Sequence, residues 1–390
     1  MNLGWKVALC GGLAFFCSFI DRLAWPPVLP LAMKELGISA TQAGAFMSFF
    51  FIGYLLTQLP GGMLADRLGT RKILLGSLVL MGIFTLSVAF TPGYEIGLAL
   101  RFLAGIGSGA VLAASVKGVH DYFEPTGRAT AMGFFMASGP LGLLTANLLS
   151  PLIAAEHGWR GSFLAAGLFT LLAAVAAFVL LPRRAVLTAV LTKEQAAARG
   201  GLKELLGHRD LMLTAAAGFF AMWGTWGTLT WANAYMSKSL GLSLPQAGQM
   251  MALFGLGALI GQPLAGWLSD KYLHRRRRTA MIILAGFALL LALFGMNTDA
   301  SLLPPLVIAL GAGAFVFGPV LNTFISEMAP TRQVATAIGL CNAIWQVGSL
   351  ISPLLAGKIL DMTGSYGGVF GILAAGPLVS VGILALVKKK

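Results

Sequence analysis

Charged residues are scarce in this sequence, and acidic residues are the scarcest. Only 11% of its 390 residues are charged, with 14 Asp or Glu among them, while 57% are hydrophobic and the mean hydropathy is +0.83. A water-soluble protein of this size needs a charged surface around a limited core, which this composition does not provide. It excludes a soluble globular domain and indicates a chain that is surrounded mostly by lipid.

The side-chain constellations of enzymes are also missing. The three cysteines, Cys10, Cys17 and Cys341, lie in apolar segments without metal-ligand spacing, so we interpret them as small packing residues. No serine or cysteine stands in a recognisable triad context, and no glycine-rich loop would cradle a phosphate. The four histidines fall near the ends of predicted helices or in loops: His120, His157, His208 and His274. We expect no enzyme activity, no metal and no cofactor.

Long apolar runs are what the sequence does contain. A helix of about 20 residues crosses about 30 Å of hydrocarbon, and runs near this length occur twelve times. They lie at about 5–30, 42–64, 73–91, 95–118, 129–154, 162–182, 209–237, 245–269, 279–296, 302–328, 334–360 and 367–387. The predicted fold class is an all-α polytopic membrane protein with twelve transmembrane helices.

The positive charges are distributed unevenly over the connections between these runs. Most of the 27 Lys and Arg residues fall near the N-terminus, in the even-numbered connections and in the tail Lys388-Lys389-Lys390. Cytoplasmic loops carry such an excess. We therefore expect both termini to be cytoplasmic in a multi-pass protein of the cytoplasmic membrane. The net charge of +13 is interpreted as this topological signal, with no role in nucleic-acid binding.

The chain reads as two related halves. "GMLADR" at 62–67 recurs as "GWLSDK" at 266–271, "RATAMG" at 128–133 as "VATAIG" at 334–339, and "SPLIA" at 150–154 as "SPLLA" at 352–356. Three matches in the same order at nearly equal offsets indicate an internal duplication. The predicted domains are a six-helix bundle at 1–182, a cytoplasmic linker at 183–208 and a second six-helix bundle at 209–390.

One of these repeated motifs resembles a known family. "GGMLADRLGTRK" at 61–72 is similar to motif A of the major facilitator superfamily, and the region from Gly266 is similar to its degenerate second copy. The helix-4 stretch "RFLAGIGSGA" resembles motif B of the same family. The resemblance implies the major facilitator fold and a gate on the cytoplasmic side. Its residues would be Gly62, Asp66, Arg67, Gly69, Arg71 and Asp270.

An acid and a base stand side by side inside the first apolar run, at Asp21 and Arg22. Charges within a bilayer are costly, so they normally face a cavity and find partners. With a rise of about 1.5 Å per residue, Asp21 and Arg101 lie at the same level of the membrane. We expect these two to pair, either as part of a coupling mechanism or as a purely structural ion pair. Arg22 would then face elsewhere and attract an anion.

The surrounding residues sharpen the resemblance. "DRLAWPPVLPLAMKELGIS" at 21–39 and "HGWRGSF" at 157–163 are similar to the anion:cation symporter branch, whose members carry organic acids with protons or sodium. This likeness implies that Arg22 and Arg101 handle the anion and that Asp21 binds the proton. Some members have a second acid where this chain has Ser108, which leaves the coupling stoichiometry open.

Neutral polar and aromatic side chains are expected to complete the site. They are Trp25 in the first half and Trp226, Asn322, Asn342, Trp345 and Gln346 in the second. Packing between helices explains buried amides as well as substrate contact does. Tryptophans near the outer end of a helix also belong to the interfacial belt.

Together these patterns predict a secondary active transporter of a small carboxylate-type anion. We expect proton coupling, with sodium as the alternative ion, alternating access between the two repeats, and function as a monomer. A proton-driven exporter of drugs or other amphipathic molecules is the alternative, because it also uses a helix-1 acid, motif B and an element like "SGPLG" at 138–142. The predicted excess of positive charge in the cavity favours the anion carrier.

Overall fold

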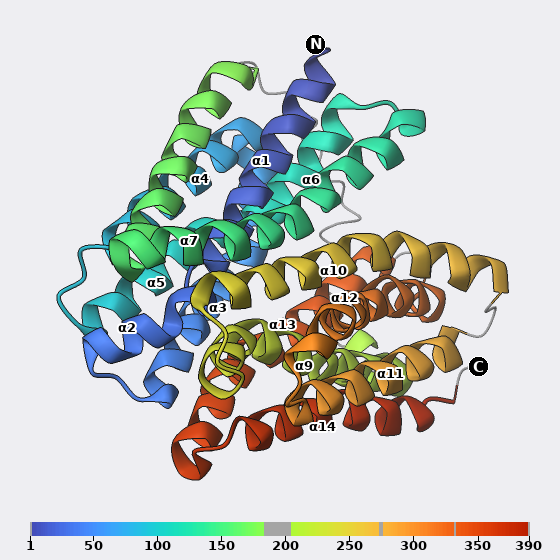
Figure 1. Cartoon of the computed structure of the whole chain (residues 1–390). Coiled ribbons are helices and arrows are strands. Elements are labelled where there is room, and N and C mark those ends of the chain that lie inside the picture. The colour runs from blue at the N-terminus through green and yellow to red at the C-terminus, as the bar shows by residue number, and fades with distance from the viewer. Residues whose placement is uncertain (1, 183–203, 273–275, 331–332, 389–390) are drawn as a thin grey trace. The chain divides into compact units, whose positions relative to one another are not determined.

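The computed structural model describes residues 2–182, 204–272, 276–330 and 333–388, without the side chains at 125, 129, 262–272 and 335. The described residues form helices and no β-strand (Figure 1). The helices of the first half are α1 (Leu3–Leu23), α2 (Leu29–Leu36), α3 (Ala40–Leu68), α4 (Thr70–Val88), α5 (Tyr94–Gly109), α6 (Val111–Tyr122) and α7 (Pro125–Leu180). A short 3₁₀ helix, η1 (Pro26–Val28), joins α1 to α2.

The second half contains α9 (Arg209–Ser239), α10 (Leu244–Tyr272), α11 (Arg276–Met296), η2 (Ala300–Leu302), α12 (Leu303–Met328), α13 (Val334–Thr363) and α14 (Tyr366–Ala385). Nine helices among the described residues are long and apolar enough to cross a membrane. One of these is α7, which covers two predicted spans because its backbone turns at Gly158, where φ is 68° and ψ is 173°. The expected all-α architecture is confirmed.

The chain packs as two compact units. One contains Met1–Ala189 and Ala232–Ala252, and the other contains Val190–Trp231 and Leu253–Lys390. The end of α9 and the start of α10 therefore group with the first unit. The predicted boundaries at residues 182 and 209 stay a prediction, since most of the proposed linker lies outside the described residues.

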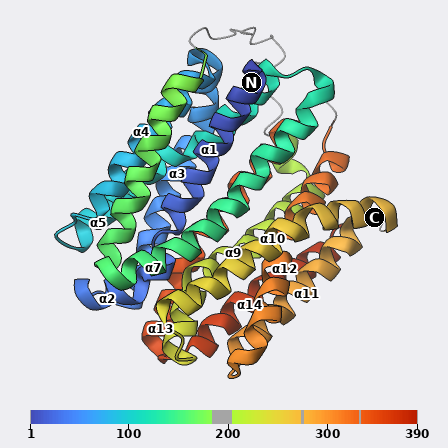
Figure 2. The ribbon, with the colours of Figure 1, turned by 45° about the horizontal axis from the view of Figure 1, so that its top comes forward.

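The same helix pairs recur in both halves. In the first, α4 packs against α5 and α7; in the second, the equivalent α11 packs against α12 and α14. Figure 2 shows the first set in blue to green and the second set in orange to red. The repeated pairing gives the sequence repeat its structural counterpart, because equivalent helices meet equivalent neighbours.

The repeat extends to the way in which helices begin. Before α3, Gly37 has a φ of 64° and Ser39 forms a capping box with Gln42. The equivalent residues before α10 are Gly241, with a φ of 69°, and Ser243, whose Oγ accepts from the backbone N–H of Gln246 at 3.4 Å. A capping box fixes the first turn of a helix by satisfying backbone N–H groups. Both halves therefore start their second long helix in the same way.

Candidate functional site

The first membrane span is broken immediately after the two charged residues. Helix α1 ends at Leu23, and two prolines open η1. A helical carbonyl accepts from the N–H four residues later, and Pro26 has no N–H. The carbonyl of Arg22 therefore needs another donor. Arg101 of α5 supplies it, with Nη2 at 3.2 Å from Arg22 O and Nη1 at 2.8 Å from Asp21 O.

Arg101 is fully buried and bonded to backbone throughout. Its Nε donates to the carbonyl of Phe46 in α3 at 3.4 Å, and its guanidinium lies 4.6 Å from the ring centroid of Phe50. The Asp21 carboxylate attracts this guanidinium but forms no ion pair within 4.0 Å of it among the described residues, and the two residues meet through the backbone carbonyl of Asp21. The physical reason is the helix break, whose free carbonyls take the donors of the guanidinium.

The carboxyl group of Asp21 points toward α4 and α7. It is completely buried, and Thr170 of α7 donates to its Oδ1 at 3.0 Å. Thr85 of α4 faces the same group. Asp21 Oδ2 and Thr85 Oγ1 face one another without close hydrogen-bond geometry, and neither has another partner within the described part of the chain. A buried polar atom normally has a partner, so this carboxyl group is the most incompletely satisfied acid of the described interior.

Arg22 points toward α3 and lies among aromatic rings. It is 3% exposed, and its Nη2 is 3.4 Å from the hydroxyl of Ser18. Its guanidinium lies 4.6 Å from the ring centroid of Tyr54 and 5.3 Å from that of Phe51. Cation–π contacts hold a guanidinium without neutralising its charge. The positive charge of Arg22 is therefore kept in the interior of the first unit.

Ser108 stands where the resemblance implies that some members of the anion:cation symporter branch have a second acid. Its hydroxyl lies 2.5 Å from that of Ser18, and both side chains are buried. The two hydroxyls link α1 to α5 one turn of α1 before Arg22. A neutral pair replaces a second ionisable group at this point.

Trp25 packs behind the helix break, in a wall of aromatic side chains. Its ring is fully buried and stacks on Phe46 with centroids 4.2 Å apart and planes 6° apart, and its Nε1 donates to Ala43 O at 3.0 Å. Trp159 meets it edge to face at 6.2 Å. The ring is thus used in packing in this conformation, and contact between Trp25 and a substrate stays a prediction.

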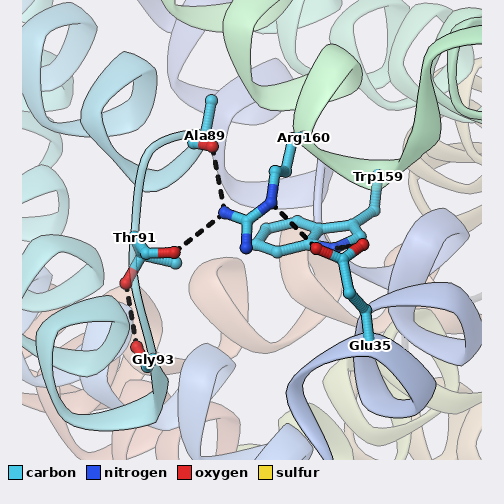
Figure 3. A network of polar contacts seen from close by, with 6 residues as sticks. All are labelled: Glu35, Ala89, Thr91, Gly93, Trp159 and Arg160. Carbon is cyan, nitrogen blue, oxygen red and sulfur yellow. Dashed lines mark hydrogen bonds and ion pairs between the residues drawn. The ribbon is translucent and has the colours of Figure 1, made fainter.

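A network of polar contacts lies beyond Trp159 (Figure 3). Glu35, at the end of α2, accepts from Trp159 Nε1 at 2.8 Å and from Arg160 Nε at 2.9 Å. Arg160 Nη1 donates to the carbonyls of Ala89 and Thr91 at 3.1 and 2.8 Å. The "HGWRGSF" segment therefore joins α2 to the connection between α4 and α5.

The motif around the turn from α3 to α4 forms contacts within the first unit. Asp66 lies 3.8 Å from the Nζ of Lys117, which also pairs with Asp121 at 2.9 Å. A Cβ built at Gly62 would lie 3.3 Å from Ala113 Cβ, so α3 and α6 pass closely there. Gly69 adopts a φ of 83° at the turn itself. Asp66 is thus paired with a base of α6, and Asp270 lies outside the described side chains.

Arg71 and Arg277 donate hydrogen bonds to backbone carbonyls at the ends of helices. Arg71 donates to the carbonyl of Phe178 at 2.7 Å and to that of Leu181, where α7 ends. Arg277, which is equivalent to Arg71 in the repeat, donates to the carbonyl of Val387 after α14. The final carbonyls of a helix lack intrahelical partners. Both arginines therefore cap the last helix of their half, while the side chain of Arg67 is exposed.

The candidates of the second half lie in the second unit. Trp345 is packed beside Phe317 in the hydrophobic core, with ring centroids 6.5 Å apart. Gln346 Oε1 accepts from Ser349 Oγ at 3.0 Å. Trp226 is 3% exposed, whereas Asn322 and Asn342 are half-buried. Their contact with a substrate stays a prediction.

Comparison with known proteins decides the family. The sequence matches the Major Facilitator Superfamily over residues 11–235 and again over 214–390. The chain belongs to the major facilitator superfamily. It is 26% identical over 392 residues to the hexuronate transporter of Bacillus subtilis (strain 168), covering 96% of this chain and 92% of that protein. It is 27% identical over 396 residues to a probable sulfoacetate transporter, SauU, of Cupriavidus necator, covering 96% and 90%.

A solved structure agrees with this assignment at the level of the fold. A mutant of the nucleoside transporter NupG has a TM-score of 0.83 with 14% sequence identity, covering 98% of this chain and all of that one. As a superfamily member, the chain is a multi-pass membrane protein and a secondary transporter. It is not an enzyme, as its composition indicated.

Among the described residues of this superfamily member, the buried charged residues all lie in the first repeat. At the offset of the "FF" pairs Phe15-Phe16 and Phe219-Phe220, Asp21 corresponds to Thr225 and Arg22 to Trp226. At the offset of Gly105 and Gly311, Arg101 corresponds to Val307. The second half forms the same helices with neutral residues at these places. The helix arrangement that the two repeats share therefore does not by itself require a buried charge at these positions.

Some of these residues escaped the sequence interpretation. Thr85 and Thr170 are threonines in apolar helices, a pattern that carries no positional signal. Glu35 stands in the quoted "DRLAWPPVLPLAMKELGIS" stretch, but nothing there names Arg160 as its partner. The free carbonyl of Arg22 did have a signal, namely Pro26 four residues later.

Proposed function

We propose that this chain carries a small organic anion of the carboxylate type across the cytoplasmic membrane together with a proton. The two repeats would alternate in opening the site to either side, with both termini in the cytoplasm and the monomer as the working unit. The motif at Gly62, Asp66, Arg67, Gly69, Arg71 and Asp270 would form the cytoplasmic gate.

One observation carries the preference for an anion. The described residues contain three buried charged side chains, Asp21, Arg22 and Arg101. With all three ionised, the interior carries one excess positive charge; with Asp21 protonated it carries two. A buried excess of positive charge attracts anions and repels cations. This supports the anion carrier over the exporter of cationic amphipathic compounds.

The relatives support the same class of substrate. Hexuronates are carboxylates, and sulfoacetate carries a sulfonate as well as a carboxylate. Both chemical groups present the oxygen geometry that a guanidinium binds with two hydrogen bonds. The substrate proposed here is therefore a compact organic acid, with Trp226, Asn322, Asn342, Trp345 and Gln346 as its contacts from the second half.

The three buried charged residues would have different roles. Arg22 would receive the anion, and Arg101, whose donors are used on carbonyls, would position the broken helix around it. Protonation of Asp21 raises the positive charge beside Arg22 and so raises anion affinity. By thermodynamic linkage the anion then favours protonation to the same extent. This reciprocity is what a symporter requires.

Binding and uptake by purified protein test the proposal. We expect D-glucuronate, sulfoacetate or a similar acid to raise the unfolding temperature, and to raise it more at pH 5.5 than at pH 8, because protonated Asp21 favours the anion. Arg22→Gln should weaken that binding by about 10- to 100-fold, as expected for a lost charge-assisted hydrogen bond. Asp21→Asn should abolish uptake driven by a pH gradient in liposomes while leaving anion binding measurable.

Lys34→Gln is the matched control, because it removes one positive charge from an exposed position at the end of α2. It should bind and transport like the unmodified protein. Stabilisation by lipophilic cations alone would contradict the anion assignment. Undiminished proton-driven uptake by Asp21→Asn would contradict the coupling assignment.

A further inference from the structure

The carboxyl group of Asp21 is completely buried between three helices, and we call its surroundings the pocket. Asp21 of α1, Thr85 of α4 and Thr170 of α7 are all 0% exposed. Thr170 Oγ1 donates to Oδ1 at 3.0 Å. The remaining oxygens, Asp21 Oδ2 and Thr85 Oγ1, face one another without close hydrogen-bond geometry, and neither has another partner among the described residues. One hydrogen between them, from the threonine hydroxyl or from a protonated carboxyl group, would satisfy both atoms.

The pocket is separate from the side on which Arg22 lies. Asp21 and Arg22 are consecutive in a helix, so their side chains diverge by about 100°. Arg22 meets Phe50, Phe51 and Tyr54 of α3, whereas Asp21 meets α4 and α7. A proton and an anion can therefore occupy adjacent places without direct contact.

Few titratable groups face this carboxyl group. Arg101 of α5 reaches its backbone, and the thiol of Cys17 lies one turn earlier in α1. Helices α4 and α7 contribute the two hydroxyls. The ionisable residues of α6 lie far away, because Gly118 of α6 meets Val7 of α1, about 20 Å along the helix from Asp21 at about 1.5 Å per residue.

The two hydroxyls have different tasks in the two charge states. An ionised carboxylate is an acceptor only, and a protonated one has a single O–H to donate. Thr170 already donates to Oδ1, a bond that stabilises the ionised form more strongly than the neutral one. A protonated Oδ2 would donate to Thr85 Oγ1, which has no other partner among the described residues.

We propose that Thr85 and Thr170 are positioning residues of a proton site at Asp21, with Thr85 accepting the bound proton and Thr170 holding the ionised carboxylate. This inference rests on the proposed function, in which Asp21 is the coupling acid. When the proton is bound, one hydrogen bond forms between Asp21 Oδ2 and Thr85 Oγ1. When it leaves, the bond from Thr170 remains, and the Thr85 hydroxyl can turn its own hydrogen toward Oδ2.

The test is the pH profile of uptake by two valine variants. Symport needs protonated Asp21, so uptake falls as the pH rises. Thr85→Val removes the acceptor of the neutral acid and should move the pH of half-maximal uptake down. Thr170→Val removes the donor to the carboxylate and should move it up. Loss of one hydrogen bond predicts shifts of about 0.5 to 1 pH unit in each direction.

Further variants keep the test decisive. Thr85→Ser and Thr170→Ser restore the hydroxyls and should restore the profile. Thr214→Val is the control, since Thr214 is buried in α9 and its Oγ1 donates to the carbonyl of Asp210 within that helix at 2.9 Å. Should a valine variant fail to accumulate, alanine at the same position also removes the hydroxyl, and the pH dependence of anion-induced stabilisation of that variant measures the same shift.

Opposite shifts support the inference, and shifts in one direction or none overturn it. A change in the sodium concentration for half-maximal uptake, with an unchanged pH profile, would also overturn it and assign a metal cation to the pocket. If Asp21→Asn abolishes proton coupling while both valine variants behave normally, only this inference fails. If Asp21→Asn stays fully coupled, the proposed function itself fails.

Discussion

Arg160 Nε lies 2.9 Å from Glu35 Oε1, and this ion pair joins two segments that are 125 residues apart in the chain. The other carboxylate oxygen accepts from the indole of Trp159 (Figure 3). Because Trp159 also meets Trp25, the contact runs from the end of α2 to the aromatic wall behind the helix break.

We call the ion pair between Glu35 and Arg160 the clamp. The equivalent positions of the second half carry no charge and cannot form it. At the repeat offsets, Glu35 corresponds to Ser239 and Arg160 to Tyr366. In the first half, α2 follows the break at Pro26-Pro27, whereas α9 runs unbroken through the equivalent region to Ser239. A broken span needs contacts that fix its detached end. The clamp and the break therefore belong together.

We predict that Arg160→Lys lowers the stability of the fold more than Glu35→Gln. The lysine loses the fork that reaches Glu35 and two carbonyls, at a cost of about 2 kcal/mol, while the half-exposed ion pair alone contributes about 1 kcal/mol or less. The measurement is thermal unfolding followed by a thiol-reactive dye, since the three cysteines are free and buried. Glu156→Gln, at an 80% exposed side chain nearby, is the control. Equal unfolding temperatures for the control and Arg160→Lys would contradict the clamp.

Arg101 should behave as a cap and not as an anion receptor. Lysine keeps the charge but cannot donate at once to the carbonyls of Asp21, Arg22 and Phe46. We therefore expect Arg101→Lys to lower the unfolding temperature of the ligand-free protein by several degrees. The affinity for a bound organic acid should remain within about twofold, a difference under about 1 kcal/mol.

Arg22→Lys provides the matched comparison, with the opposite expected result. Its ligand-free stability should change little, because its guanidinium contacts rings and side-chain hydroxyls and no backbone carbonyl of the break, while anion affinity should fall clearly. If Arg101→Lys instead loses anion binding at unchanged stability, Arg101 contacts the substrate and the capping role is secondary.

Helix positions were predictable because lipid imposes one length and one composition on every span. The runs at 42–64 and 302–328 correspond to α3 and to η2 with α12. The helix break was less visible, since apolar residues continue through Trp25 and Val28. What terminates α1 is the missing N–H of Pro26 and Pro27, and hydropathy does not register a missing donor.

The sequence predicted the depth of the site in the membrane, but it did not predict which atoms meet there. A fixed rise per residue placed Asp21 and Arg101 at one depth, and the structure brings them together there. Depth does not decide whether a guanidinium meets a carboxylate or a carbonyl. That choice depends on which acceptors the backbone leaves free, and therefore on Pro26. The partners of Asp21, Thr85 and Thr170, depend on helix rotation, which an apolar sequence specifies weakly.

A close helix crossing recurs at the same place in each half of the repeat. A Cβ built at Gly105 would lie against the carbonyl of Phe50, and one built at Gly311 against the carbonyl of Phe254. Gly105 and Gly311 are equivalent in the repeat, as are the two phenylalanines. In both cases the atom that the Cβ would meet belongs to the backbone, so a change of side-chain rotamer cannot make room for it.

Alanine at these two glycines is predicted to destabilise each half to a similar extent. Moving the helices apart to admit a methyl group should cost about 3 kcal/mol, seen as a lower unfolding temperature or reduced accumulation in the membrane. Gly76→Ala in α4 and Gly286→Ala in α11 are the matched controls, because a Cβ there has nothing within 4 Å. These controls should be neutral or stabilising by about 0.5 to 1 kcal/mol, since alanine favours the helix. If Gly105→Ala behaves like Gly76→Ala, α3 and α5 are not held at the distance that the glycines permit.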